Sequence, residues 1–151
     1  MKIKCLFTTL AALSLLACGK ENPDSPTAAE SIEYSGTVTV IYQEAPFDNE
    51  NIQVTYIPAE DGQTASITIH RIRFVPQMPV SIDVTIPDIA LQASGEKTLL
   101  SCEKTIPLAM GGEYPKYTVT NLEGELLGDA LHFSLNFGKY PTSFSGQRKQ
   151  D

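Results

Sequence analysis

The chain has 151 residues, of which 42% are hydrophobic, 8% aromatic and 19% charged, and this composition predicts one globular domain rather than a disordered chain. The 18 acidic residues outnumber the 11 basic residues and give a net charge of -7. Because this charge repels phosphate groups, it argues against nucleic acid as a partner and against adsorption to anionic membrane surfaces.

The first residues have the pattern of a secretory signal. Lys2 and Lys4 precede the uncharged apolar run 5–17, which matches the charged and apolar regions of a signal peptide. The run is shorter than the roughly 20 residues that a membrane-spanning helix needs. We therefore expect residues 1–17 to be a signal peptide rather than a permanent anchor.

The segment Leu15-Leu16-Ala17-Cys18 resembles the bacterial lipobox, in which a small residue precedes a cysteine that becomes the lipid-modified N-terminus. This resemblance implies lipidation at Cys18 and a lipoprotein of a Gram-negative cell envelope, anchored in the outer membrane and facing either the periplasm or the cell surface. The alternative is an unmodified cysteine in an ordinary signal. Residues 19–31 are polar and contain two prolines, so we expect residues 18–31 to form the lipidated cysteine and a flexible tether.

The cysteine count predicts that no intramolecular disulfide forms. Cys5 would leave with the signal and Cys18 would carry lipid, so Cys102 would remain alone. Cys102 follows the apolar pair Leu99-Leu100 and has no histidine nearby in the sequence. We expect it to be a small buried hydrophobic residue and not a reactive thiol.

From Tyr34 onward, apolar and polar residues alternate as they do in half-buried strands. The sets expected to share a face are Tyr34, Val38, Val40 and Tyr42; Ile52, Val54 and Tyr56; Ala65, Ile67 and Ile69; Val80, Ile82, Val84 and Ile86; and Leu131, Phe133, Leu135 and Phe137. Later strands are expected at 98–104, 116–122, 124–127, 130–137 and 142–145.

No part of the region after the signal shows a capped helical period, so the pattern predicts a single all-β domain at 32–147, followed by a tail at 148–151. Short strands joined by short turns fit either a closed up-and-down barrel or a two-sheet β-sandwich. The alternation by itself does not separate these two architectures.

A resemblance favours the barrel. The segment Tyr34-Ser35-Gly36-Thr37-Val38-Thr39-Val40 looks like the opening strand of the calycin-like, or lipocalin-like, β-barrel lipoproteins of Bacteroidetes. Residues 124–135 look like the penultimate hairpin of that family, and residues 142–146 look like its closing strand. The resemblance implies a single eight-stranded antiparallel barrel whose last strand returns to the first. True lipocalins carry a Gly-x-Trp near their first strand, and this chain has no tryptophan.

The sequence offers no recognisable catalytic or metal-binding motif. His70 and His132 are isolated in the sequence, and the acidic pairs lie in predicted turns. Neither a glycine-rich phosphate loop nor a Gly-x-Ser-x-Gly motif is present. We therefore expect no metal, no cofactor and no enzymatic activity.

The stretch 65–74 contains two arginines in an otherwise alternating strand. If the alternation continues unbroken, Arg71 and Arg73 point into the barrel and form an anion-recognising end of a ligand pocket. The predicted pocket residues are Arg71, Arg73, Tyr42, Tyr56 and Tyr117. The alternative, which we favour, is a β-bulge near His70 that keeps Ile72 and Phe74 inside and turns the arginines outward.

The tyrosines have two interpretations. Tyr34, Tyr42, Tyr56 and Tyr117 fall on predicted strands, whereas Tyr114 and Tyr140 lie beside turns. They could contact a carbohydrate or a peptide at the mouth of the barrel, or they could be core residues with a hydroxyl at the rim.

Our leading hypothesis from the sequence is a non-enzymatic envelope lipoprotein, held at the membrane by its N-terminal lipid, whose calycin-like barrel binds a small hydrophobic or amphipathic ligand. The alternative is a structural or interaction module whose filled barrel contacts another envelope protein or a glycan. An empty interior favours the first hypothesis, and a packed interior favours the second.

Overall fold

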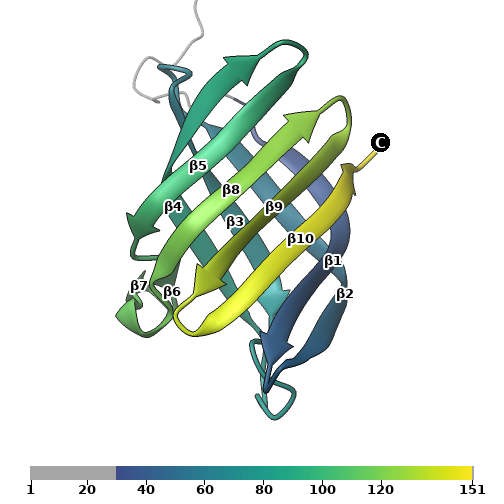
Figure 1. Cartoon of the computed structure of the whole chain (residues 1–151), viewed down its shortest axis with the longest axis vertical. Coiled ribbons are helices and arrows are strands. Elements are labelled where there is room, and N and C mark those ends of the chain that lie inside the picture. Colours follow the sequence, from purple (N-terminus) through teal and green to yellow (C-terminus); the bar gives the residue numbers. More distant parts are fainter. Residues whose placement is uncertain (1–29, 151) are drawn as a thin grey trace, which may run out of the picture.

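The computed structural model describes residues 30–150, and most of them belong to β-strands (Figure 1). The strands are β1 (Ile32–Tyr42), β2 (Ala45–Pro58), β3 (Thr64–Ile72), β4 (Ile82–Ser94), β5 (Lys97–Thr105), β6 (Leu108–Ala109), β7 (Gly112–Glu113), β8 (Val119–Leu127), β9 (Ala130–Phe137) and β10 (Tyr140–Arg148), with one 3-10 turn, η1 (Pro115–Tyr117). The all-β prediction is confirmed. In this part of the chain, no helix is long and apolar enough to cross a membrane. The predicted signal peptide and Cys18 lie outside the described residues.

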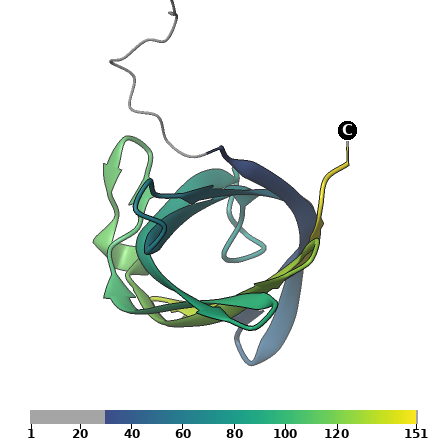
Figure 2. The ribbon, with the colours of Figure 1, turned by 90° about the horizontal axis from the view of Figure 1, so that it is seen from above.

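Eight of the strands form a closed antiparallel barrel in which each strand pairs with its neighbours along the chain. The ring runs β1, β2, β3, β4, β5, β8, β9 and β10, and β10 pairs with β1 to close it (Figure 2). The remaining strands, β6 and β7, form a small hairpin, in which β6 pairs with Val84 and Thr85 of β4, outside the stretch of β4 that pairs with β5. The barrel prediction is confirmed over the sandwich, and the architecture fits a calycin-like fold.

The inward faces follow the predicted alternation. Buried apolar residues include Tyr34, Val38, Val40, Ile52, Val54, Tyr56, Ala65, Ile67, Ile69, Val84, Ile86, Leu131, Phe133, Leu135 and Phe137. Between the last four, His132 and Ser134 are exposed and Asn136 is only partly buried. Three residues depart from the prediction: Tyr42 and Ile82 are only partly buried, at the end of β1 and the start of β4, and Val80 is 61% exposed because it precedes β4.

Four residues with left-handed backbone mark β-bulges in the barrel. Asn51, Arg71, Asp88 and Asn121 have φ of 58°, 62°, 62° and 54°, and each lies where the strand register shifts. A bulge adds one residue to one strand. If even-numbered residues face inward before the bulge, odd-numbered residues face inward after it, and the reverse. The inward-facing positions of β2, β3, β4 and β8 therefore switch between odd and even residue numbers at the bulge, so that the apolar residues on both sides of it stay inside.

The bulges at Asp88 and Asn121 and the turn at Pro115 make the observed strand boundaries differ from the predicted ones. The strand expected to end near Ile86 continues to Ser94, because the bulge at Asp88 makes Ile89 the next inward residue. The two strands expected at 116–122 and 124–127 are a single strand, β8, whose alternation is interrupted at Asn121. Residues 115–117 form η1 instead, since Pro115 suits the first turn of a helix.

The seam between the first and last strands depends on glycine. Gly36 on β1 lies opposite Gly146 on β10. A methyl group on Gly36 would collide with the backbone of Ser145 and Gly146. The absence of a side chain at Gly36 thus allows the two strands to approach closely and close the ring.

The two ends of the barrel are built differently. One end, the hairpin end, holds the turns at 59–63, 95–96 and 128–129 and the start of β1. The C-terminal residues also lie there, because the Arg148 N–H donates to the Asp129 carbonyl at 2.7 Å. The opposite end, the loop end, holds the longer segments 73–81 and 106–118 (Figure 1).

Candidate functional site

An aromatic plug closes the barrel at the loop end. Phe74, which follows β3, is fully buried, and its ring stacks on Tyr117 at a centroid distance of 4.1 Å. The Phe74 ring also meets the Phe137 ring edge to face, with centroids 4.9 Å apart and an interplanar angle of 71°. In Figure 2 the segment after β3 lies within the outline of the ring. The protein's own side chains therefore occupy the position where a ligand would enter from this end.

The segment that carries the plug is held by local bonds. The Phe74 N–H donates to the Met78 sulfur at 3.1 Å, and the Met78 N–H donates to the Val75 carbonyl at 3.1 Å. On the other side, Gly138 has φ of 59°, and its N–H donates to the Thr118 carbonyl at 2.8 Å. A Cβ at Gly138 would meet the Lys116 carbonyl at 2.7 Å, so glycine there allows η1 to pack against the β9–β10 turn.

The rest of the interior is filled by apolar side chains. Phe133 and Phe144, on the paired strands β9 and β10, are both buried, with ring centroids 5.3 Å apart. Tyr34 and Tyr56 are buried near the hairpin end, and burial raises the pKa of both hydroxyls. In the described chain, no buried side-chain polar atom is left without a hydrogen-bond partner. The interior is therefore a packed core, as is common in barrels of this size.

A row of tyrosines leads from the plug to the surface of the loop end. The ring centroid of Tyr117 lies 6.2 Å from that of Tyr140 and 5.2 Å from that of Tyr114. The ring centroids of Tyr140 and Tyr42 are 6.3 Å apart. Tyr117 is buried, whereas Tyr42, Tyr114 and Tyr140 are partly exposed. Lys139 places its ammonium group 5.6 Å from the Tyr140 ring centre, within the range of a cation–π contact.

A depression of about 610 Å³ lies beside Tyr42 and Tyr140 at this end. Its lining residues are Ile41, Tyr42, Gln43, Glu44, Val75, Lys139, Tyr140 and Pro141. The Gln43 amide donates to the Tyr42 hydroxyl at 3.3 Å. The depression thus combines exposed tyrosine faces with an amide, a carboxylate and an ammonium group, which is the mixture that a polar ligand with an apolar face requires.

The turn that borders this depression has an unfavourable backbone. Gln43 and Glu44 have φ of 53° and 64°, so both central residues of the β1–β2 turn are left-handed. Such turns normally use asparagine and glycine, which adopt this conformation at little cost. The chain keeps two long polar side chains at strained positions, and strain of this kind concentrates at binding sites.

The five predicted pocket residues do not form one site, and the interior placement of the arginines is wrong. The bulge at Arg71 reverses the alternation, so Ile72 and Phe74 are buried while Arg71, in β3, and Arg73, just after it, are exposed on the outside of the barrel. This is the arrangement that the bulge alternative predicted. Of the three predicted tyrosines, Tyr56 is buried near the hairpin end, and Tyr42 and Tyr117 lie at the loop end, connected through Tyr140.

The structure also shows where Cys102, His70 and His132 lie. Cys102 is partly buried against the core, and burial raises the pKa of its thiol, which disfavours the reactive thiolate. His132 is exposed on β9. His70 lies on the outer face, with its Nε2 2.9 Å from the Thr55 hydroxyl and its Nδ1 3.3 Å from Asp83 Oδ2. Within residues 30–150, no three His, Cys, Asp or Glu side chains come together as a metal site needs.

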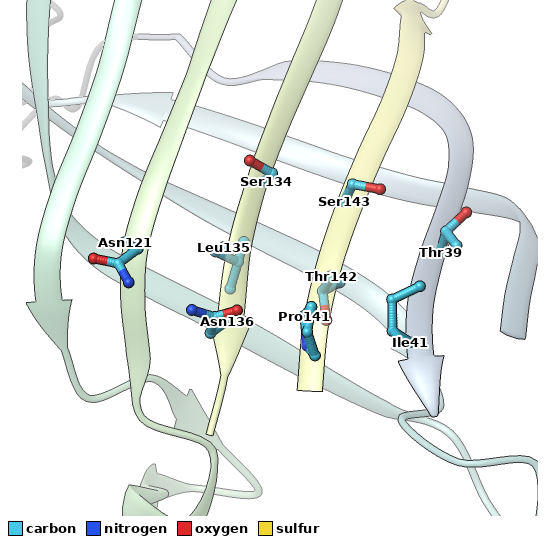
Figure 3. Close-up of a pocket in the computed structure, with 9 residues that line it drawn as sticks. All are labelled: Thr39, Ile41, Asn121, Ser134, Leu135, Asn136, Pro141, Thr142 and Ser143. Atoms are coloured by element: carbon cyan, nitrogen blue, oxygen red, sulfur yellow. The ribbon is translucent and has the colours of Figure 1, made fainter. Parts of the chain in front are cut away.

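A second depression, of about 300 Å³, lies on the outer wall over β1, β8, β9 and β10 (Figure 3). Its polar side chains are hydroxyls and amides from Thr39, Asn121, Ser134, Asn136, Thr142 and Ser143, and none of its lining residues is charged. The depression can exchange hydrogen bonds with a ligand, but it offers no aromatic ring and no ionisable group. The loop end carries more of the groups that bind a ligand.

No model of a known protein family matches the chain, and no curated protein is significantly similar to it in sequence. The site therefore has to be interpreted from its own residues. The sequence contained one signal for it: the dipeptide Lys-Tyr occurs at 116–117 and again at 139–140, and both copies contribute to the aromatic row. What the sequence did not show was that Phe74 closes the barrel beneath them.

Proposed function

We propose that the chain is a non-enzymatic envelope lipoprotein whose filled barrel is an interaction module, and that its loop end binds a glycan. The observation that carries this proposal is the plug of Phe74, Tyr117 and Phe137, which occupies the loop end of the barrel and leaves Tyr42 and Tyr140 partly exposed above it. A filled interior favours binding at the surface over binding inside the barrel.

The chemistry of the depression supports a glycan as the ligand. A sugar ring has an apolar face, which suits the partly exposed rings of Tyr42 and Tyr140, and hydroxyl groups at its edge. Gln43, Glu44 and Lys139 supply an amide, a carboxylate and an ammonium group around those rings. The volume of about 610 Å³ is within the range of small-ligand sites.

The proposed anchor orients the module. The lipid would be attached at Cys18, and the tether at 19–31 would join it to β1, which starts at the hairpin end. The loop end would then be the part of the barrel farthest from the membrane. Cys18→Ala tests the anchor: the variant should leave the membrane fraction, and a variant that still sediments with membranes would contradict lipidation at this residue.

Glycan binding is tested by screening the folded domain against immobilised neutral and acidic glycans and then measuring the affinity of each hit by calorimetry. Tyr140→Ala should weaken binding roughly two- to tenfold, because a stacked aromatic residue contributes about 0.5–1.5 kcal/mol. The matched control is Leu127→Ala, which alters an exposed apolar residue at the hairpin end. Equal affinity in the Tyr140 variant, or binding to a purified envelope protein that requires neither Tyr42 nor Tyr140, would contradict the proposal.

The filled interior has its own test. A fluorescent apolar probe should not bind the native barrel with one-to-one stoichiometry, whereas Phe74→Ala should open a cavity beneath Tyr117 that admits the probe. If a probe binds the native protein stoichiometrically and a fatty acid displaces it, the barrel is a calyx and the interior-ligand hypothesis holds instead.

A further inference from the structure

The bulge in β3 places two arginines side by side on the outer wall. Arg71 has φ of 62°, and Ile72, the residue between the arginines, is fully buried. Arg71 and Arg73 are both exposed. Both residues line one groove, so the two side chains share one patch of surface beside the loop end.

Side chains from the neighbouring strands fix the backbone that carries these arginines. The Arg71 N–H donates to Asp83 Oδ1 at 2.9 Å, and the Arg73 N–H donates to Asn49 Oδ1 at 3.0 Å. The Asn49 amide donates in return to the Arg73 carbonyl at 3.1 Å. The segment is therefore held from both sides, although it lies where β3 ends, and the spacing of the arginines does not depend on a ligand.

Neither guanidinium group is neutralised by residues 30–150. The ion pair there is Lys97–Glu125 at 3.2 Å, and His70 Nδ1 lies 3.3 Å from Asp83 Oδ2; neither contact involves an arginine. The nearby carboxylates accept hydrogen bonds from other groups: Asp83 accepts the Arg71 N–H and lies beside His70, and Asp48 accepts a hydrogen bond from Thr39 at 2.7 Å. Both guanidinium groups therefore keep their donors free for an anion, although Asp48 and Glu50 keep their negative charges in the same lining.

The arginines line a groove of about 500 Å³. Its other lining residues are Phe47, Asp48, Asn49, Glu50, Asn51, Ile52, Gln53, His70 and Ser81. Asn51, Gln53 and Ser81 supply neutral hydrogen-bonding groups. Glu50 is the lining carboxylate for which the described residues show no hydrogen bond or ion pair, and it limits how much negative charge the groove tolerates.

We propose that this groove binds a single oxyanion group, a carboxylate, sulfate or phosphate, through the guanidinium groups of Arg71 and Arg73. Arginine forms paired hydrogen bonds with such groups, and two arginines that line one groove present two sets of donors to one anion. A long polyanion does not fit, because the net charge of -7 repels it at a distance. A ligand with one charged group on a neutral body avoids that repulsion.

This site goes beyond the proposed glycan site and uses none of its side chains, so either site can exist without the other. The two sites are neighbours, however, because Arg73 lines the groove and Val75, two residues later, lines the tyrosine depression. A glycan that carries a uronate or a sulfate group could contact both sites.

The test is a titration of the folded domain, monitored by two-dimensional NMR, with sodium sulfate, inorganic phosphate, glucuronate and, as a neutral control, glucose. We expect saturable shifts of the Arg71 and Arg73 side-chain N–H signals with at least one oxyanion, none with glucose, and an affinity that falls as sodium chloride is added. The three oxyanion arms identify which group is preferred. Absence of saturable shifts with all three oxyanions would overturn the proposal.

Variants provide the second measurement. Arg73→Gln should raise the dissociation constant roughly tenfold or more, since it removes charge-assisted hydrogen bonds, and Arg73→Lys should recover part of the affinity. Lys104→Gln is the matched control, because it removes one positive charge from an exposed residue on β5. Unchanged oxyanion affinity in Arg71→Gln/Arg73→Gln would overturn the proposal, and so would an equal loss in Lys104→Gln. Tyr140→Ala should leave the oxyanion shifts unchanged, which separates this site from the glycan site.

Discussion

The hairpin end and the loop end of the barrel use the same strands but connect them differently. At the hairpin end, glycines with left-handed backbone, Gly95 and Gly128, turn the chain in tight hairpins. At the loop end, the segments 73–81 and 106–118 are long enough to fold over the barrel and place aromatic rings in and above it. The long segments place Phe74 and Tyr117 at the loop end, and the two-residue turns there contribute Gln43, Glu44 and Lys139, so the loop end is the functional candidate.

The tyrosines show the same contrast. Tyr34 and Tyr56, near the hairpin end, are 2% and 5% exposed and belong to the core. Tyr42 and Tyr140, at the loop end, remain partly exposed beside a depression. The same residue type therefore stabilises one end of the barrel and offers a binding surface at the other, and the connections decide which role it takes.

Removal of the plug should have the largest effect. Phe74→Ala is expected to lower the free energy of unfolding by about 3–5 kcal/mol, because it leaves a cavity among fully buried rings. Urea unfolding measures the loss. Phe144→Ala, in the other aromatic pair, should cost a similar amount without admitting an apolar probe at the loop end. A loss below about 1 kcal/mol in Phe74→Ala would show that the loop end is not packed as described.

The strand seam should respond next most strongly. Gly36→Ala should destabilise the barrel by roughly 1–3 kcal/mol, because the new methyl group overlaps the backbone of β10. Gly112→Ala, in the β6–β7 hairpin, is the matched control, since nothing lies within 4 Å of its Cβ position. The comparison is made by thermal and urea unfolding of both variants. Equal stability of the two would mean that the close approach of β1 and β10 is not required.

The turns at the two ends should respond in opposite directions. The double variant Gln43→Asn/Glu44→Gly should raise the free energy of unfolding by about 1 kcal/mol, because it relieves two left-handed residues, and should weaken glycan binding. Gly128→Ala, at the hairpin end, should lower it by about 1 kcal/mol because it introduces that strain. Chemical unfolding measures both changes. A loss of stability in the double variant would show that Gln43 and Glu44 contribute to folding rather than to binding.

The smallest effect should be an alkaline loss of stability from the buried tyrosines. Burial raises the pKa of Tyr34 and Tyr56 above the ordinary 10.0, so the unfolded chain releases these protons first. The contribution of these two hydroxyls to the free energy of unfolding should be fully present below pH 10. It should be lost as the pH rises through the pKa values of the folded state. Unfolding by urea at several alkaline pH values should show this slope, and Tyr34→Phe/Tyr56→Phe should reduce it. An unchanged slope in that variant would assign the effect to other groups.

Much of the fold could be predicted because apolar and polar residues alternate along a strand that has one buried face. Residues 131–137 lie within a single strand without a bulge, and every one of their predicted orientations is correct. The stretch 65–74 shows where this reasoning stops. Its first half follows simple alternation, but the bulge at Arg71 forms because β3 must match β4 and because Asp83 and Asn49 bind its backbone.

The candidate site was harder to predict than the fold, since it joins residues that are distant in the sequence. Tyr42, Phe74, Tyr117 and Tyr140 lie in or beside four different connections, and apart from the repeated Lys-Tyr dipeptide no local pattern links them. The tyrosines beside turns were recognisable as candidates for carbohydrate or peptide contact. Their relation to Phe74, which closes the barrel beneath them, depends on how the loop segments cross its end.

By itself, the sequence determined the all-β class, the inward faces between bulges, and the acidic charge that disfavours polyanions, because these follow from composition and from the two-residue period of a strand. Only the tertiary structure decided where bulges reverse the alternation of inward and outward residues, and that Arg71 and Arg73 therefore lie outside. It also decided which tyrosines belong to the core and which lie at the surface. Strand pairing and the crossing of loops over the barrel set these features, and both depend on contacts between residues far apart in the chain.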